Sequence, residues 1–89
     1  MTETLRLRAD DMTWRSVESE IVVLDQRDST YLAVNRSGSV LWPLLAEGAT
    51  RPELAAALVE RFGIEEARAA SDVDAFIEFL AGRDFLAPA

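Results

Sequence analysis

The feature that most constrains the fold is a change of hydrophobic period at Val34-Asn35. Between Met12 and Val34, β-branched and aromatic residues form short runs that are typical of strands. From Asn35 to Leu80, apolar residues recur at helical spacing instead. Strands followed by helices, rather than alternating with them, indicate an α+β domain with helices on one face of an antiparallel sheet. The same layout occurs in winged helix-turn-helix domains.

The first half predicts three strands, at about 13–18, 20–26 and 30–34. Turns at Ser19-Glu20 and at residues 27–29 separate them. Such short connections predict an antiparallel meander with the second strand in the middle.

The second half predicts three helices. Asn35 and Gly48 suit the two ends of the first helix, although Pro43 lies inside it and should kink it. Thr50-Arg51-Pro52-Glu53 is a capping box that starts the second, which Gly63 ends. The third spans about 65–81, with the option of a joint near Ser71.

Residues 1–11 are expected to be a flexible lead-in whose apolar residues could dock on the domain edge, and residues 12–89 to form the domain. This charged segment lacks the apolar stretch of a secretory signal, and no apolar run approaches 18 residues. A cytoplasmic location without membrane association is the resulting expectation.

The inventory of reactive side chains argues against an enzyme. The 89 residues include no histidine and no cysteine, and all nine basic residues are arginine. The usual general base, thiolate nucleophile, Schiff-base lysine and zinc ligands are therefore missing. We expect no catalysis, no metal and no cofactor. The net charge of −7 also argues against nucleic acid binding, which requires neutralisation of phosphates.

The third strand is the most informative candidate for function. In a three-stranded meander residues 30–34 form an edge, and they carry no charge, proline or bulge signal to protect it. Such an edge can accept another peptide as an added strand. The structural alternative is that the last helix or the N-terminal tail covers it. The last helix carries a broad apolar stripe, with Phe79 and Ala69 beside it, that could form a groove against this strand.

The residues that carry a family resemblance follow an ordered pattern: Asp25, Tyr31, Val34, Asn35, Gly38, Leu41 and Trp42. This pattern, extended through residues 44–63 and 71–86, resembles the PqqD-like family, also described as RiPP recognition elements. Within this family, the small stand-alone domain is most similar to the leader-peptide-binding proteins of lasso peptide biosynthesis. Pro43 and Arg36 depart from the pattern.

The resemblance implies a three-stranded sheet packed on three helices and a role in presenting a ribosomally made precursor peptide. The leader segment would add as a fourth antiparallel strand on the third strand, against the last helix. It would be basic and carry a Tyr-x-x-Pro element. A separate leader peptidase, with a cyclase, would act on the presented peptide. The implied contacts are Thr30, Tyr31, Leu32, Ala33 and Val34 for the edge, Val73, Phe76, Ile77 and Leu80 for the apolar wall, and Asp72, Asp74 and Glu78 for basic leader residues.

Other functions fit the same layout. One is a PqqD-type peptide chaperone for a radical-SAM or other peptide-modifying enzyme. Another is a winged-helix scaffold that dimerises through two third strands. A winged-helix transcription factor is disfavoured, because the last two helical regions are acidic or alanine-rich.

Overall fold

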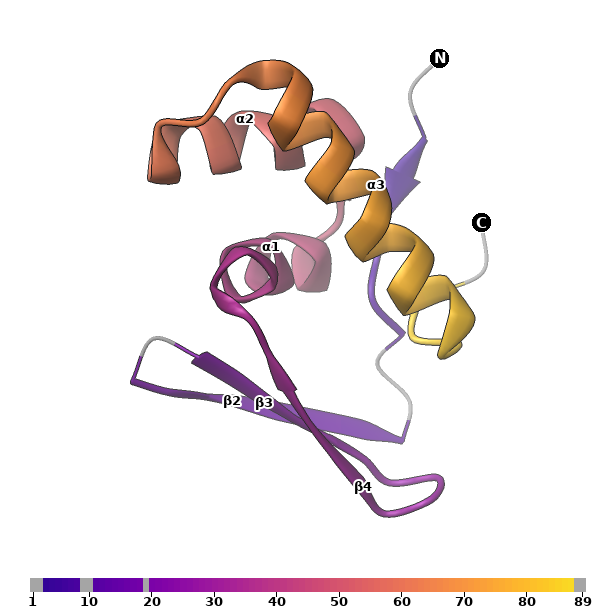
Figure 1. The fold of residues 1–89 in the computed structure, drawn as a ribbon. Helices are drawn as coiled ribbons and strands as arrows, with labels where there is room; N and C mark the ends of the chain where they lie inside the picture. The colour runs from indigo at the N-terminus through magenta and orange to yellow at the C-terminus, as the bar shows by residue number, and fades with distance from the viewer. Residues whose placement is uncertain (1–2, 9–10, 19, 88–89) are drawn as a thin grey trace.

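A three-stranded antiparallel sheet forms one layer of the domain (Figure 1). The computed structural model describes residues 3–8, 11–18 and 20–87. The strands β2 (Met12–Val17), β3 (Glu20–Asp25) and β4 (Thr30–Val34) lie in the order β2-β3-β4. The predicted meander with a central second strand is confirmed; of its first turn, Ser19 lies outside the described residues.

Three helices lie on one side of this sheet, with α1 next to it (Figure 1). They are α1 (Arg36–Glu47), α2 (Arg51–Phe62) and α3 (Glu66–Gly82). The predicted ends are confirmed: Asn35 accepts a bond from the Gly38 N–H at 2.8 Å, and Thr50 and Glu53 form a reciprocal capping box. Because each cap satisfies backbone donors that the first turn leaves free, the local sequence defines where these helices begin.

Two details of the helices differ from what the sequence predicts. α1 runs without interruption through Pro43, which is exposed on its surface. α3 is one continuous helix of 17 residues, so no joint forms at Ser71. A proline on the solvent side forfeits one backbone bond but leaves the buried face of the helix intact.

The N-terminal segment differs from the loose lead-in that the sequence predicts. β1 (Thr4–Leu5) pairs with β5 (Ala49–Thr50), and Leu7 forms a bridge with Leu86 near the C-terminus. Leu7 is buried, and its N–H donates to the Leu45 carbonyl at 2.9 Å. Residues 4–8 are therefore built into the domain, because their alternating leucines find apolar partners from α1 and the tail.

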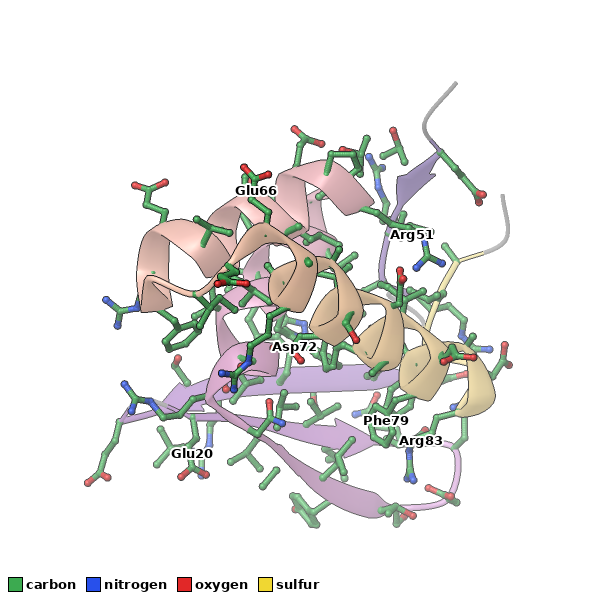
Figure 2. All side chains as sticks on the ribbon, turned by 45° about the horizontal axis from the view of Figure 1, so that its top comes forward. Glu20, Arg51, Glu66, Asp72, Phe79 and Arg83 are labelled. Atoms are coloured by element: carbon green, nitrogen blue, oxygen red, sulfur yellow. The ribbon has the colours of Figure 1, made fainter. Side chains whose placement is uncertain are left out.

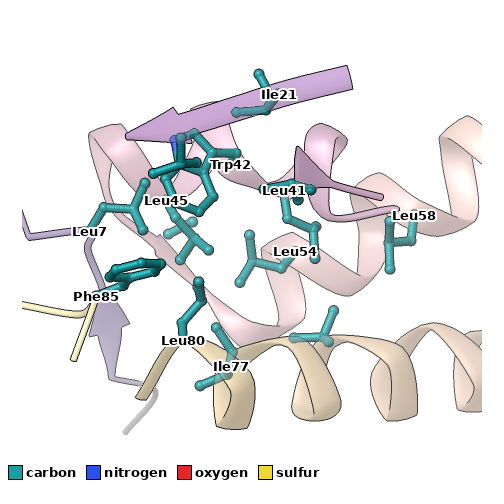
Figure 3. Packing of buried hydrophobic residues seen from close by; sticks show 14 of the residues in the cluster. Leu7, Ile21, Leu41, Trp42, Leu45, Leu54, Leu58, Ile77, Leu80 and Phe85 are labelled. Atoms are coloured by element: carbon teal, nitrogen blue, oxygen red, sulfur yellow. The ribbon is translucent and has the colours of Figure 1, made fainter. Parts of the chain in front are cut away.

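A single hydrophobic core lies between the sheet and the helices (Figure 3). Trp42 is fully buried at its centre, with edge-to-face contacts to Trp14 and Phe85, each at 6.3 Å between ring centroids. The buried side chains of α3 that complete this core are Ala69, Val73, Ile77 and Leu80. No helix in the described part of the chain is long and apolar enough to cross a membrane.

Candidate functional site

The open edge of the sheet is defined by how β3 bonds to its two neighbours. The Gln26 N–H donates to the Asp11 carbonyl at 2.8 Å, so even-numbered residues of this segment direct their backbone groups toward β2. Ile21, an odd-numbered residue, instead directs its N–H toward β4. That N–H reaches Ser39 Oγ at 3.0 Å, and the Ser39 hydroxyl donates to the Val34 carbonyl at 3.1 Å. Ser39 thus bridges the last pair of the β3–β4 ladder.

This alternation identifies the groups that β4 leaves available. In an antiparallel ladder, residues that exchange bonds with one neighbour alternate with residues whose N–H and C=O face away from it. Leu32 and Val34, opposite Val23 and Ile21, face β3. Tyr31 and Ala33 therefore direct their N–H and C=O groups toward the open edge, since among the described residues no strand follows β4 in the sheet.

The alternative that the tail covers this edge does not hold for the described residues. The N-terminal segment pairs with β5 and with Leu86, away from β4. α3 does not cover the edge either, because residues of α3 and β4 line opposite sides of one open groove. The edge consequently stays accessible along Thr30–Val34.

A groove of about 610 Å³ lies directly beside this edge. β4 forms one wall, α3 the other, and the first turns of α1 the floor. The side chains of Leu32 and Val34 point into the helix-facing side of the sheet, whereas Tyr31 points to the opposite face. The lining residues are Leu32, Ala33, Val34, Asn35, Ser37, Gly38, Leu41, Arg68, Asp72, Ala75, Phe76 and Phe79.

Gly38 allows the two walls of the groove to approach its floor closely. It is buried in the first turn of α1, and a Cβ at this position would collide with Val34 Cγ1 and lie 2.8 Å from Phe76 Cε1. Such contacts are far inside van der Waals distance. The glycine therefore serves close approach of β4 and α3 to α1.

The structure divides the predicted wall residues of α3 between groove and core. Of the four residues that the resemblance implies for the apolar wall, Phe76 lines the groove. Val73, Ile77 and Leu80 do not: they are at most 4% exposed and belong to the core. The reason is helical geometry, because Val73, Ile77 and Leu80 share one face that points at α1 and α2.

A second, neighbouring face of α3 supplies the groove instead. Asp72, Ala75, Phe76 and Phe79 recur at intervals of three or four along it. Phe79 is 41% exposed and stacks on Phe76, with ring centroids 6.4 Å apart. Figure 2 shows Asp72 and Phe79 along α3. Phe79 was not among the predicted wall residues. The sequence signal that could have identified it is an aromatic residue directly beside an apolar stripe that is already long enough to fill the core.

The acidic residues of α3 do not form one rim. Asp72 lines the groove and pairs with Arg68 at 3.9 Å, so the charge at this point is balanced. Asp74 instead pairs with Arg51 at the start of α2, at 2.6 Å. Glu78 is exposed and does not line the groove. Of the three predicted carboxylates, the structure therefore brings only Asp72 to the groove.

The end of α3 is fastened to the β3–β4 turn by an ionic cluster. Arg27 makes two bonds to the buried Asp25 carboxylate, at 3.0 and 2.8 Å, and one to Asp84 at 3.2 Å. The Arg83 guanidinium lies over the rings of Phe79 and Phe85, at 5.7 and 5.5 Å. The cluster thereby ties the turn that precedes β4 to the end of α3.

This cluster predicts a pH dependence of stability. The side-chain bonds from Arg27 hold the pKa of Asp25 below its ordinary value of 3.8. A depressed folded-state pKa stabilises the protein above the unfolded value, and this stabilisation is lost as pH falls through the folded value. We expect the melting temperature to fall as the pH drops below about 4, and the gap between the parent and Asp25→Asn to close as it does. Asp74→Asn, an exposed control, should track the parent; a gap for Asp25→Asn that is constant with pH would contradict the assignment.

The groove and the edge of β4 present mainly backbone groups and apolar side chains. Among residues 3–8, 11–18 and 20–87, no three carboxylate, histidine or cysteine side chains are grouped to hold a metal ion. What the arrangement can do is bind an extended chain along β4.

Comparison with known proteins agrees with this geometry. The family described as coenzyme PQQ synthesis protein D (PqqD) matches residues 20–86. A structure of TbiB1 in complex with the TbiA(beta) leader peptide superposes with a TM-score of 0.83 at 24% identity, covering 94% of this chain and 96% of that one. A structure of lasso peptide synthetase B1 complexed with the leader peptide gives 0.81 at 23%, covering 94% and 98%. No curated protein sequence matches significantly. Because the family match spans most of the described chain and the fold agrees, the protein belongs to the PqqD family.

Proposed function

We propose that this protein binds the leader segment of a ribosomally synthesised precursor peptide, of the lasso peptide class, and presents it to a separate leader peptidase. The observation that carries this proposal is the open edge of β4 directly beside the apolar groove. Both structural neighbours are complexes with a leader peptide. The protein itself performs no chemistry in this proposal.

The geometry specifies how a leader would lie. Its backbone would bond to the N–H and C=O groups of Tyr31 and Ala33 as an antiparallel strand. The leader residue opposite Leu32 would then sit in a non-hydrogen-bonded pair, where side chains approach most closely, and would point into the groove. Phe76 and Phe79 would form the apolar wall that receives it. A proline is tolerated opposite Leu32, because its missing N–H would face away from β4.

Titration of isotope-labelled protein with the leader encoded beside its gene tests the proposal. We expect the largest amide shifts at Tyr31 and Ala33 and along the groove face of α3, from Asp72 to Phe79. Unchanged amides on β4 at saturating leader would overturn strand addition. The presentation step is tested separately, by comparing the rate at which the leader peptidase cleaves the precursor with and without this protein.

Phe79→Ala should weaken leader binding by about tenfold or more, because an aromatic anchor in a groove supplies much of the affinity of such an interface. Its free energy of unfolding should fall by only about 1 kcal/mol, since Phe79 is already 41% exposed. Calorimetric titration and thermal melting measure the two quantities.

Two variants serve as controls for Phe79→Ala. The double change Asp74→Asn, Glu78→Gln keeps the helix but alters carboxylates outside the groove, and should leave leader affinity within about twofold. Ile77→Ala should instead destabilise the fold by about 2–5 kcal/mol, because it opens a cavity in the core. Equal affinity of Phe79→Ala and the parent would remove Phe79 from the binding site.

A further inference from the structure

The face of the sheet opposite the helices carries a strip of apolar side chains along β3 and β4. Figure 1 shows this face without a covering helix. Tyr31 is 71% exposed there, the largest value among the large hydrophobic residues of the described chain. Leu24, its partner in the pairing of β3 and β4, is half-buried beside it. Val22 and Ala33 form the next pair of the strip.

The strip is continuous with the open edge through the same two residues. Tyr31 and Ala33 direct their backbone groups toward the edge while their side chains point to the outer face. A peptide bonded to them must place the residues opposite Tyr31 and Ala33 on that same outer face. These two peptide residues flank the one that enters the groove, so the docked strand is read on both of its faces.

We propose that Tyr31 is a specificity-determining residue that contacts the outward-facing side chain of the docked peptide strand. This inference rests on the proposed function and extends it to the face that the groove does not reach. The residue opposite Tyr31 would be aromatic or β-branched, because such side chains make the favourable cross-strand pairs with an aromatic residue. The residue opposite Ala33 would be a longer apolar one, since the small alanine leaves room for it to reach Val22.

The occupant is the peptide strand rather than a second copy of the chain. The apolar strip is one residue wide on each of β3 and β4, and the exposed Arg15 and Glu20 border it. A second copy laid over this face of the sheet would bury those charges, whereas a strand placed next to β4 extends the strip without burying them. We take that strand to be the leader peptide, because both structural neighbours are complexes with a leader peptide. The edge groups of Tyr31 and Ala33 provide the bonds that hold it there.

Binding of an alanine-scanned set of the synthetic leader, taken from the precursor encoded beside the gene, tests the inference. Tyr31→Ala should weaken binding of the parent leader about two- to fivefold, and Tyr31→Phe should restore it. One alanine variant of the leader should bind the parent protein and Tyr31→Ala with the same affinity. The position changed in that variant should be adjacent to the position that couples to Phe79→Ala. Thr13→Ala, on the same face but at the opposite edge, is the matched control.

The outcomes separate this inference from the proposed function. Normal affinity of Tyr31→Ala, or an equal loss with every leader variant, would overturn the outer contact while leaving groove binding intact. No binding of the leader to the parent protein would overturn the proposed function itself. Self-association of the peptide-free protein that Tyr31→Ala abolishes would assign the strip to a second copy instead and overturn the inference.

Discussion

Replacing Ala33 by proline is expected to weaken leader binding by at least about tenfold while leaving the protein folded. The Ala33 N–H points to the open edge. The substitution therefore removes a donor that the added strand needs, but it breaks no hydrogen bond within the sheet. Proline is compatible with an edge strand when its missing N–H faces outward. Loss of the bond, together with the pyrrolidine ring at the edge, should cost more than about 1.4 kcal/mol of binding free energy.

Ser16→Pro is the matched control for this experiment. Ser16 is an exposed residue of β2, the opposite edge of the same sheet, and its register places its backbone groups on the outer side. It should melt at a temperature similar to that of Ala33→Pro and bind leader like the parent. If Ala33→Pro binds leader normally, strand addition on β4 is wrong. If both variants lose binding equally, the effect is a general loss of sheet structure, which circular dichroism would reveal.

Trp42→Ala should be the most destabilising of the changes considered. The Trp42 side chain is fully buried and makes edge-to-face contacts with Trp14 and Phe85, so truncation leaves a cavity between sheet and helices (Figure 3). Large-to-small changes of this kind cost about 3–5 kcal/mol. For a domain of this size the melting temperature should fall by more than about 12 °C, and much of the population could unfold at 37 °C.

Trp42→Phe is the control for the loss of volume. It keeps an aromatic ring in the core and removes the indole N–H, which has no bonding partner among the described residues. It should therefore cost clearly less than the alanine change. Leader affinity of the folded Trp42→Phe protein should match that of the parent, because Trp42 does not line the groove. A small loss of stability in Trp42→Ala would contradict its place at the centre of the core.

The local sequence predicts the elements because the signals that define them are local. Asn35, Thr50 with Glu53, and Gly63 satisfy or terminate backbone bonds of the neighbouring turn, so their effects do not depend on the rest of the fold. The switch of hydrophobic period at Val34 likewise determines the order of strands and helices. The edge at residues 30–34 followed from the same short-range connections.

The division of α3 into core and groove faces was not predictable in this way. Val73, Phe76, Ile77 and Leu80 form one apolar stripe in sequence, and only the angle at which α3 crosses α1 and α2 turns Phe76 outward with Phe79. The partners of Asp74 and Asp84 were equally hidden, since Arg51 and Arg27 are distant in sequence. The sequence offered docking of the N-terminal leucines only as an option, and their partner, Leu86 for Leu7, is 79 residues away along the chain.

By itself, the sequence determined the class of fold, the positions of strands and helices, the unprotected edge and the family. The first three depend on periodicity, caps and short connections, which act over a few residues, and the family follows from the resemblance of an ordered residue pattern. Only the tertiary structure decided which side chains line the groove, which carboxylates pair with which arginines, and which backbone groups of β4 face outward. Those properties depend on helix rotation and strand register, which are set by the packing of the whole core.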